Sequence, residues 1–333
     1  MPDRDPLQGP IALTLGDAAG IGPEIVVKLH MAGLAAPCVV YGDWPALQRA
    51  AQRLEAKLVI TPITEVDPEK FQQPHPGHLY VRPTPAPLPA DLMMGQVDAR
   101  AGQSAFDALC MAIDDANHKR VRAIVTAPLN KEAMHAAGLD FPGHTEILAQ
   151  RSGSEHVAMM LVNAQLRVIL ATIHVALAEV PRLITPELEL RTICLAHQAC
   201  LSLGIATPRV AVAGLNPHAG EHGKFGREDL DVIAPAIARA RAQGIEASGP
   251  WPGDTIFMRA RRGDFDIVVA QYHDQGLIPI KYLGLDEGVN VTVGLPFVRT
   301  SVDHGTAFDI AGLGIADPAS LRTAFDLALK LTA

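Results

Sequence analysis

Short apolar runs rich in β-branched residues alternate along the chain with longer segments in which apolar residues recur at helical spacing. The apolar runs lie at 11–17, 38–43 and 123–128, and the helical segments at 22–33, 44–56 and 95–118. Strands that alternate with helices in this way predict a mostly parallel α/β sheet. Prolines are dense between about 61 and 95, which indicates loops and short edge strands there.

Three later apolar runs each lead to a histidine. The segments RVILATIH, RVAVAGLNPH and DIVVAQYH end at His174, His218 and His273. Ligands of parallel sheets bind beyond the carboxyl ends of the strands, so the three imidazoles are candidates for one site. Neutral imidazole suits zinc and other divalent transition ions, and three protein ligands leave a position open for substrate. Taken singly, each histidine could instead be a half-buried residue that closes its strand.

Asp274 directly follows His273 and precedes Gly276. A carboxylate beside a ligand histidine can orient the imidazole ring or bind the metal's water. The alternative interpretation is a residue that starts a turn before the glycine.

A second group of side chains could bind an anion. The segment FPGHTE places His144 and Thr145 after a Pro-Gly turn at the start of a helix, where backbone N–H groups can hold a phosphate or a carboxylate. Helix capping would explain Thr145 equally well. Lys131, in TAPLNKEAM, is either available to an anion or a solvated helix residue.

Lys281, Asn290 and Arg299 recur at intervals of nine beyond His273. Each alone is typical of a surface residue. Arginine pairs with carboxylate or phosphate in a fork geometry and lysine supplies a point charge. Together, on glycine-rich loops near His273, these residues could form an anion clamp.

The N-terminal glycines Gly16, Gly20 and Gly22 lie between a strand and a helix, and Asp43 follows the next strand. This order imitates a dinucleotide-binding fingerprint, but the spacing is not GxGxxG. A tight turn that shapes the substrate pocket is the favoured interpretation, and a dinucleotide site here is the alternative.

Composition narrows the class of protein. The chain has 333 residues, of which 48% are hydrophobic and 19% charged, with a formal net charge of −8. Such a chain can bury a large core, and its length suggests two domains. It lacks the clustered basic surface of a nucleic-acid binder. Without an apolar leader or a run of roughly 20 apolar residues, we expect a cytoplasmic protein that does not enter membranes. The four cysteines form no CxxC pair and are expected to be reduced.

Several long motifs resemble, in order, the 4-hydroxythreonine-4-phosphate dehydrogenase family of pyridoxal phosphate synthesis. They are GDAAGIGPEI, TAPLNKEAM, FPGHTEILA, GLNPHAGEHGKFGRED, YHDQGLIPIK and GVNVTVGLPFVRTSVDHGTAFDIAG. The resemblance covers roughly residues 11 to 330. HGTAFDIAGLGIADP is also similar to the adenine-binding loop of isocitrate and isopropylmalate dehydrogenases, to whose fold the family belongs.

The resemblance implies two α/β domains, with mostly parallel mixed sheets, around a central cleft that holds the active site. We expect the first domain to comprise residues 1–125 and 305–333, with both termini. The second, residues 126–304, is expected to carry the metal and dimer-interface residues.

The resemblance also assigns roles to the candidate residues. The family's three metal-binding histidines, shared between the subunits of a homodimer, match His174, His218 and His273. Its substrate contacts fall on His144, Thr145, Lys281, Asn290 and Arg299. The dinucleotide moves from the N-terminal glycines to the loops that start at Gly294, with expected contacts at Gly294, Leu295, Asp303 and His304.

Some positions depart from the family pattern. Ala18 stands where proline is usual, Ile173 replaces a common threonine, and Gln271 replaces a common methionine. None is a ligand, so the reaction type is unaffected. The pair His144 and Thr145 favours a phosphorylated substrate, whereas the alanine of TIHVAL, where the biosynthetic enzymes often have proline, favours the sugar-acid branch.

The resemblance implies an enzyme that uses NAD or NADP and one divalent metal, namely zinc, cobalt, nickel or magnesium. The expected reaction is oxidation and decarboxylation of 4-phosphohydroxy-L-threonine to 3-amino-2-oxopropyl phosphate. Lys281 and Asp274 are the candidate catalytic residues, Lys281 for proton transfer. Alternatives within the family are dehydrogenases of D-threonate or D-erythronate 4-phosphate and of cis-dihydrodiols. From other classes, a three-histidine zinc hydrolase of phosphate esters and a non-catalytic, metal-dependent metabolite sensor are possible.

Overall fold

The computed structural model describes residues 9–284 and 288–332. The chain divides into two compact units, one formed by Met1–Val157 with Leu295–Ala333 and the other by Ala158–Gly294. The first unit is therefore discontinuous in sequence and contains both ends of the chain. The first domain expected from sequence, residues 1–125 and 305–333, is shorter than this unit at both of its internal ends.

The first unit contains six parallel strands in the order β3-β4-β2-β1-β5-β12. Their bounds are β1 (Ile11–Thr14), β2 (Cys38–Gly42), β3 (Val59–Pro62), β4 (His78–Pro83), β5 (Ala123–Thr126) and β12 (Val298–Val302). Strands β1, β2 and β5 are buried at every residue, as parallel strands covered on both faces are. β3 lies at the edge, but β4 lies between β3 and β2, so the expectation of edge strands was wrong for β4.

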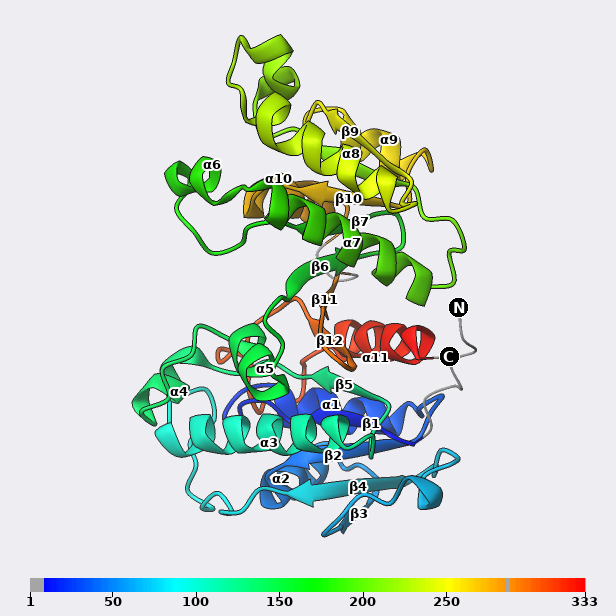
Figure 1. Cartoon of the computed structure of the whole chain (residues 1–333). Coiled ribbons are helices and arrows are strands. Elements are labelled where there is room, and N and C mark those ends of the chain that lie inside the picture. The colour runs from blue at the N-terminus through cyan, green and yellow to red at the C-terminus, as the bar shows by residue number, and fades with distance from the viewer. Residues whose placement is uncertain (1–8, 285–287, 333) are drawn as a thin grey trace. The chain divides into compact units, whose positions relative to one another are not determined.

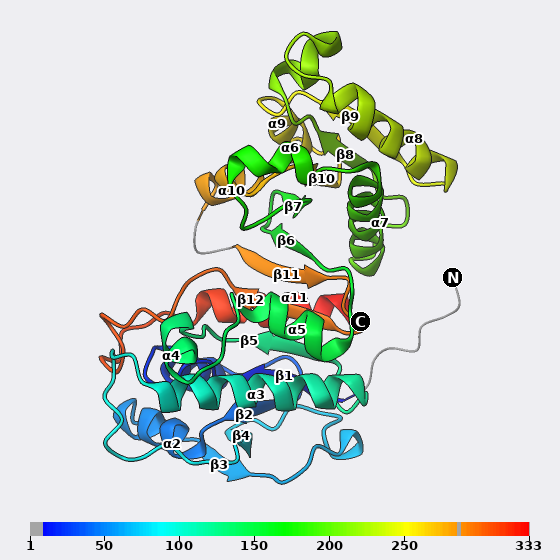
Figure 2. The same cartoon turned by 60° about the vertical axis from the view of Figure 1, so that its left-hand side comes forward.

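Helices cover both faces of this sheet. They are α1 (Gly22–Met31), α2 (Trp44–Arg53), α3 (Ala99–Asn117), α4 (Lys131–Ala136), α5 (His144–Ser152) and α11 (Ala319–Leu331), with the short turn η1 (Pro68–Lys70). Helix α3 crosses one face and α1 and α11 lie on the other (Figures 1 and 2). Asp98 caps α3 by accepting a hydrogen bond from the backbone N–H of Arg100, which is why the helix starts later than the residue 95 expected from sequence.

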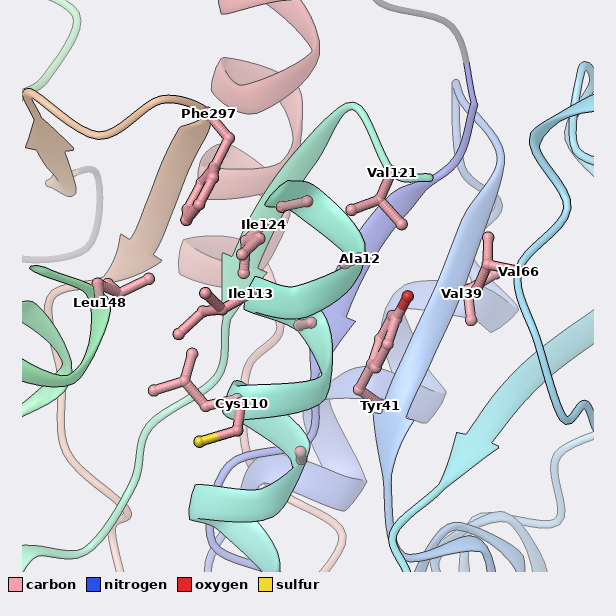
Figure 3. Close-up of a cluster of buried hydrophobic side chains, with 14 of the residues drawn as sticks. Ala12, Val39, Tyr41, Val66, Cys110, Ile113, Val121, Ile124, Leu148 and Phe297 are labelled. Atoms are coloured by element: carbon pink, nitrogen blue, oxygen red, sulfur yellow. The ribbon is translucent and has the colours of Figure 1, made fainter. Parts of the chain in front are cut away.

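The core of the first unit lies beneath α3. Ile113 and Cys110 point to the side of this helix where Leu148 lies, and Tyr41 of β2 lies on its other side (Figure 3). Ile124 of β5 and Phe297 belong to the same cluster. Burying a side chain such as Ile113 contributes about 1.5–3 kcal/mol to the free energy of unfolding. The four cysteines are all free thiols.

The second unit contains the strand order β11-β6-β7-β10-β8-β9. Their bounds are β6 (Ala158–Val162), β7 (Arg167–Leu170), β8 (Val210–Ala213), β9 (Ala247–Trp251), β10 (Ile267–Ala270) and β11 (Val289–Val293). The pairs β11–β6 and β6–β7 are antiparallel, whereas β7, β10, β8 and β9 are mutually parallel. The prediction of a mostly parallel α/β protein is confirmed.

The helices of the second unit are α6 (Val180–Leu183), α7 (Pro186–Ser202), α8 (Ala234–Ala242), α9 (Ile256–Arg261) and α10 (His273–Tyr282), with the short segments η2 (Leu177–Glu179), η3 (Pro217–Gly223) and η4 (Asp229–Ile233). Alternate residues of β7, β8 and β10 pack with α9 and α10 in one apolar cluster, and α7 packs on the other face of the same strands (Figure 2). Within residues 9–284 and 288–332, none of the helices combines the length and apolar composition that crossing a membrane requires.

Candidate active site

The three predicted metal ligands follow three neighbouring strands of the second unit. Strand β10 pairs in parallel with β7 on one side and β8 on the other, so the segments leading to His174, His218 and His273 leave the same edge of the sheet. The strands stop three to five residues before these histidines, and His273 is the first residue of α10. The prediction that each strand ends on its histidine was therefore wrong, although the shared edge was right.

Two of the three imidazoles lie close together within one chain. The ring centroids of His174 and His273 are 5.7 Å apart. Nδ1 of His273 is 2.7 Å from Oδ1 of Asp274, which assigns the proton to Nδ1 and leaves Nε2 as a donor to a metal. The ring of His218 lies instead 6.2 Å from Phe225. Over the described ranges, no group of three or more His, Cys, Asp or Glu side chains could hold a metal ion.

Gln275 of α10 links the ends of two of these strands, a role that sequence reasoning missed. Its Oε1 accepts a hydrogen bond from the backbone N–H of Gln271 at 2.7 Å, and its Nε2 donates to the carbonyl oxygen of Gly214 at 2.8 Å. The segments that carry His218 and His273 are thereby joined. The i, i+4 spacing of the two glutamines was the available signal.

Gln271, which replaces a methionine common in the family, has a buried partner. It is fully buried, and its Nε2 donates to the carbonyl oxygen of Ala213 at 2.9 Å and lies 3.4 Å from Oε2 of Glu189 on α7. Burial raises the pKa of Glu189 to about 7, while the Gln271 hydrogen bond opposes this shift and the charge of Asp229 adds to it. A methionine could not donate to this carboxyl group, so glutamine suits the position.

Three of the residues predicted to bind an anion lie in the first unit. Arg299 of β12 is 2% exposed and its Nη2 donates to Oγ1 of Thr126, on the neighbouring strand β5, at 2.7 Å. Burial lowers the pKa of Arg299 to about 9. The pKa of His144 is held well below its usual value, first by burial and then by the positive charges of Arg299 and Lys131. These three residues therefore share one electropositive environment.

His144 is the first residue of α5, and Gly143 occupies the capping position without a side-chain hydrogen bond. Thr145 lies one residue further on, so the alternative that it caps this helix was wrong. Both residues lie in the first turn, where backbone N–H groups are available to an anion. Lys131 is exposed at the start of α4, which Asn130 caps by accepting a hydrogen bond from the N–H of Ala133.

Lys281 and Asn290 belong to the second unit, on α10 and β11. The prediction that they and Arg299 lie on glycine-rich loops was wrong. Asn290 and Arg299 lie in the strands VNVTV and VRTSV, and Lys281 lies in the helix that His273 begins. Nδ2 of Asn290 lies 3.1 Å from the sulfur of Met159. Its Oδ1 is buried, and in the described part of the chain nothing donates a hydrogen bond to it.

The four predicted cofactor contacts flank β12. Gly294 has a φ of +96°, and Leu295 packs against the core beneath α3. Asp303 and His304 follow the strand, and Nδ1 of His304 lies 2.9 Å from the carbonyl oxygen of Gly305.

Two side chains of α1, which sequence reasoning missed, form hydrogen bonds with the loop that contains Gly314 and Ala316. Glu24 accepts hydrogen bonds from the backbone N–H groups of Gly314 and Ala316 at 3.1 and 2.7 Å. Lys28 donates to the carbonyl oxygens of the same two residues at 2.9 and 2.6 Å, and also to Glu24. The i, i+4 pair of opposite charges was visible in the sequence, but its long-range partners were not.

The N-terminal glycines are required by a tight turn. A Cβ at Gly16 would lie 2.2 Å from the carbonyl oxygen of Pro128, and one at Gly22 would lie 2.1 Å from that of Leu15. Asp17 is buried in this turn, where its Oδ1 accepts a hydrogen bond from the N–H of Ala19. Burial raises the pKa of Asp17 to about 6.

An α/β scaffold with imidazole groups beyond its strands, and with a buried guanidinium on one strand, is typical of enzymes that act on anionic small molecules. Comparison with known proteins identifies the family within this class. The chain belongs to the family described as pyridoxal phosphate biosynthetic protein PdxA, whose model matches residues 34–328. The prediction of an oxidoreductase of this family is confirmed.

Relatives agree over nearly the full length. A 4-hydroxythreonine-4-phosphate dehydrogenase of Beijerinckia indica subsp. indica is 53% identical over 331 residues, covering 98% of this chain and 96% of the relative. A D-threonate 4-phosphate dehydrogenase of Cupriavidus necator is 49% identical over 318 residues, 94% of each chain. The crystal structure of a 4-hydroxythreonine-4-phosphate dehydrogenase from Klebsiella pneumoniae matches with a TM-score of 0.87 and 42% identity, covering 98% of this chain and 100% of that one.

Proposed function

We propose that the protein oxidises 4-phosphohydroxy-L-threonine with NAD or NADP, and that the oxidised acid loses CO2 to give 3-amino-2-oxopropyl phosphate. The observation that carries this proposal is the 53% identity, over almost the whole chain, to an enzyme named for this substrate. The electropositive group of His144, Lys131 and Arg299 supports a substrate that bears a phosphate.

The proposed substrate contacts are His144, Thr145, Lys281, Asn290 and Arg299. Arg299 is almost fully buried, and a desolvated guanidinium attracts an anion more strongly than one in water. His144, neutral because of its lowered pKa, adds a hydrogen bond without adding charge. The buried Oδ1 of Asn290 accepts a hydrogen bond from a hydroxyl or amino group of the substrate.

We further propose that His174, His218 and His273 hold one zinc, cobalt, nickel or magnesium ion. Three imidazoles fit zinc, cobalt or nickel, whereas magnesium prefers oxygen ligands. Asp274 orients the ring of His273 through the 2.7 Å contact at Nδ1. A bound divalent ion supplies Lewis-acid chemistry, which lowers the pKa of a coordinated hydroxyl and stabilises developing negative charge.

The metal site is proposed to be shared by two copies of the chain in a homodimer. His174 and His273 lie together, whereas His218 does not join them within the chain, so a second copy would contribute its own residue 218. Exposed apolar side chains support an interface in this region. Leu177 near His174, and Ile278 and Tyr282 on α10, are 67%, 64% and 88% exposed.

Gly294, Leu295, Asp303 and His304 are the proposed contacts of the dinucleotide, whose nicotinamide accepts the hydride. Nζ of Lys281 is proposed to take the proton of the substrate hydroxyl and to return it to the carbon from which CO2 departs. Asp274 acts through His273, whose ring it orients. We place the reaction in the cytoplasm, the compartment that keeps the four free thiols reduced.

A substrate panel tests this proposal. The purified protein is given NAD or NADP, each candidate metal in turn, and 4-phosphohydroxythreonine, threonate 4-phosphate, erythronate 4-phosphate or a cis-dihydrodiol, and reduced cofactor is followed by absorbance. We expect the highest kcat/KM with 4-phosphohydroxythreonine. Release of phosphate without dinucleotide would favour the hydrolase, and binding without turnover would favour the sensor.

Sharing of the metal site is tested by mixing two inactive variants, His174→Ala and His218→Ala, under conditions of subunit exchange. If residue 218 reaches the site of the other copy, each mixed dimer has one intact site and activity returns. If all three ligands come from one chain, both sites of the mixed dimer stay damaged. Absence of recovery despite demonstrated exchange would overturn the shared arrangement.

A second candidate, oxidation of D-threonate 4-phosphate, is favoured by the 49% identical relative named for that substrate. Ala176 is the alanine of TIHVAL and has a φ of −61°, which proline would also adopt. The backbone therefore does not explain why proline is missing here. A higher kcat/KM for threonate 4-phosphate in the panel above would establish this alternative.

A further inference from the structure

The turn that carries His218 has an unusual backbone. Five consecutive residues, His218 to His222, have φ values of 54°, 52°, 79°, 39° and 56°, which is the left-handed helical region. Only the third of them, Gly220, is a glycine. Residues with a Cβ are disfavoured in this region, and left-handed residues normally occur singly. Such a run persists only where the surrounding structure holds it.

Backbone hydrogen bonds connect this turn to the residues on either side of it, among them that from the N–H of Ala219 to the carbonyl oxygen of Asn216 at 3.0 Å. The backbone N–H of Phe225 donates to the carbonyl oxygen of Gly220 at 3.1 Å, and that of Lys224 donates to Glu221 at 3.2 Å. The side chains of His218 and His222 are exposed. Burial of these two side chains therefore does not hold the turn, and further support comes from contacts at its base.

Asp229, at the start of η4, supplies those contacts. It is fully buried. Its Oδ1 accepts a hydrogen bond from the N–H of Leu215 at 2.8 Å, and its Oδ2 accepts from the N–H and Nδ2 of Asn216 at 3.1 and 2.9 Å. These are the residues through which the chain passes from β8 into the left-handed turn.

The carboxylate also fits tightly against the turn itself. A Cβ at Gly214 would lie 2.8 Å from Oδ1 of Asp229, and one at Gly220 would lie 3.3 Å from Oδ2. Nδ2 of Asn216 has a second acceptor in Oε2 of Glu228 at 2.8 Å. A single buried carboxylate thus contacts both the entrance and the middle of the turn.

We propose that Asp229 is a positioning residue for His218, which it holds in its metal-binding orientation by stabilising the left-handed turn. This inference rests on the proposed metal site and adds to it a residue that touches neither metal nor substrate. Loss of an outer partner of a metal ligand typically weakens metal binding about 10- to 100-fold, and Asp229 acts one step further out, through the backbone.

The test measures binding of Co2+ to the purified dimer by isothermal titration, for wild type, Asp229→Asn and Asp231→Asn. Asparagine keeps the shape of Asp229 but places an NH2 group against N–H groups that need an acceptor. Asp231 is the matched control, because it lies two residues away, is 51% exposed and pairs with the guanidinium of Arg227 at 2.8 Å. Melting temperatures are recorded for all three.

We expect Asp229→Asn to bind Co2+ about 10-fold more weakly or worse, with the control within about twofold of wild type. Turnover of Asp229→Asn should recover at saturating Co2+, which a collapsed active site would not allow. Adding Ala219→Gly to Asp229→Asn should restore part of the affinity, because glycine adopts positive φ without the Cβ penalty.

Unchanged Co2+ affinity in Asp229→Asn would overturn the inference and leave the proposed function standing. Failure of wild type to bind Co2+, Zn2+ or Ni2+ would overturn the metal site and the inference with it. If Asp229→Asn does not fold, Asn216→Ala removes the side-chain hydrogen bonds of Asn216 to Asp229 and Glu228 and leaves the carboxylate of Asp229 in place. It should weaken Co2+ binding in the same direction, and unchanged affinity there would also count against the inference.

Discussion

Replacing Glu189 by glutamine isolates the cost of ionising a carboxyl group inside the second unit. Glu189 is fully buried, and burial raises its pKa from 4.5 to about 7. The folded-state pKa is thus higher than the unfolded-state value. Below pH 4.5 the group is protonated in both states and makes no difference to stability. As the pH rises from 4.5 to 7 the unfolded state loses its proton first, so the free energy of unfolding falls.

The size of this effect follows from the shift. The difference between pKa values of 4.5 and about 7 corresponds to roughly 3 kcal/mol of stability between pH 4.5 and pH 8. Glutamine has the same shape, carries no charge at any of these pH values, and keeps an oxygen that can accept from Nε2 of Gln271. The variant should therefore gain about 3 kcal/mol relative to wild type over this range.

Urea unfolding followed by circular dichroism, at half-unit steps of pH, measures the difference in free energy of unfolding. Glu187→Gln is the control on the same helix, because Glu187 is exposed and pairs with Arg239 at 3.0 Å, and its pKa is lowered by that hydrogen bond. The control should show no gain at high pH. A stability difference for Glu189→Gln that stays constant from pH 4.5 to 8 would refute the raised pKa.

Three further predictions concern other sites. Burial lowers the pKa of His30 from 6.5 to about 4, so wild type should lose stability as the pH falls between these values. His30→Gln should remove about 3 kcal/mol of that loss, measured by melting at each pH. Parallel plots of stability against pH for the two proteins would contradict this. Glu24→Gln weakens two hydrogen bonds to the loop, so hydrogen exchange at Ala316 should accelerate by mass spectrometry, and equal protection would argue against the contact. Arg299→Lys should raise KM for the phosphorylated substrate about 10- to 100-fold, since one charged hydrogen bond contributes about 1.5–3 kcal/mol; unchanged KM would remove Arg299 from the substrate site.

The sequence was sufficient for the fold class and for the shared edge of the three histidines. Both depend on local pattern, because parallel strands covered on two faces are continuous apolar runs that stand out from the helices between them. The position of the segment 78–83 within the sheet was harder to predict. HLYVRP alternates polar and apolar residues, as an edge strand does, and only its pairing with β2 and β3 reveals that β4 lies inside the sheet.

The supporting residues could not be predicted because their partners are distant in sequence. Asp229 acts on Leu215 and Asn216, and Glu24 acts on a loop that starts 290 residues later. In the sequence each is an acidic residue in a helical segment, indistinguishable from a solvated one. Their roles depend on burial, which a single sequence does not show.

The discontinuity of the first unit has a consequence during synthesis. Strand β12 pairs with β5 in a register that joins Val298 to Ala123, so the whole of Ala158–Gly294 emerges from the ribosome before this pairing can form. At about 5–20 residues per second, β5 keeps one unpaired edge for roughly 10 to 35 seconds. An exposed parallel edge invites pairing with other chains. We expect early-arrested nascent chains of this protein to need chaperone protection until residue 302 has left the exit tunnel.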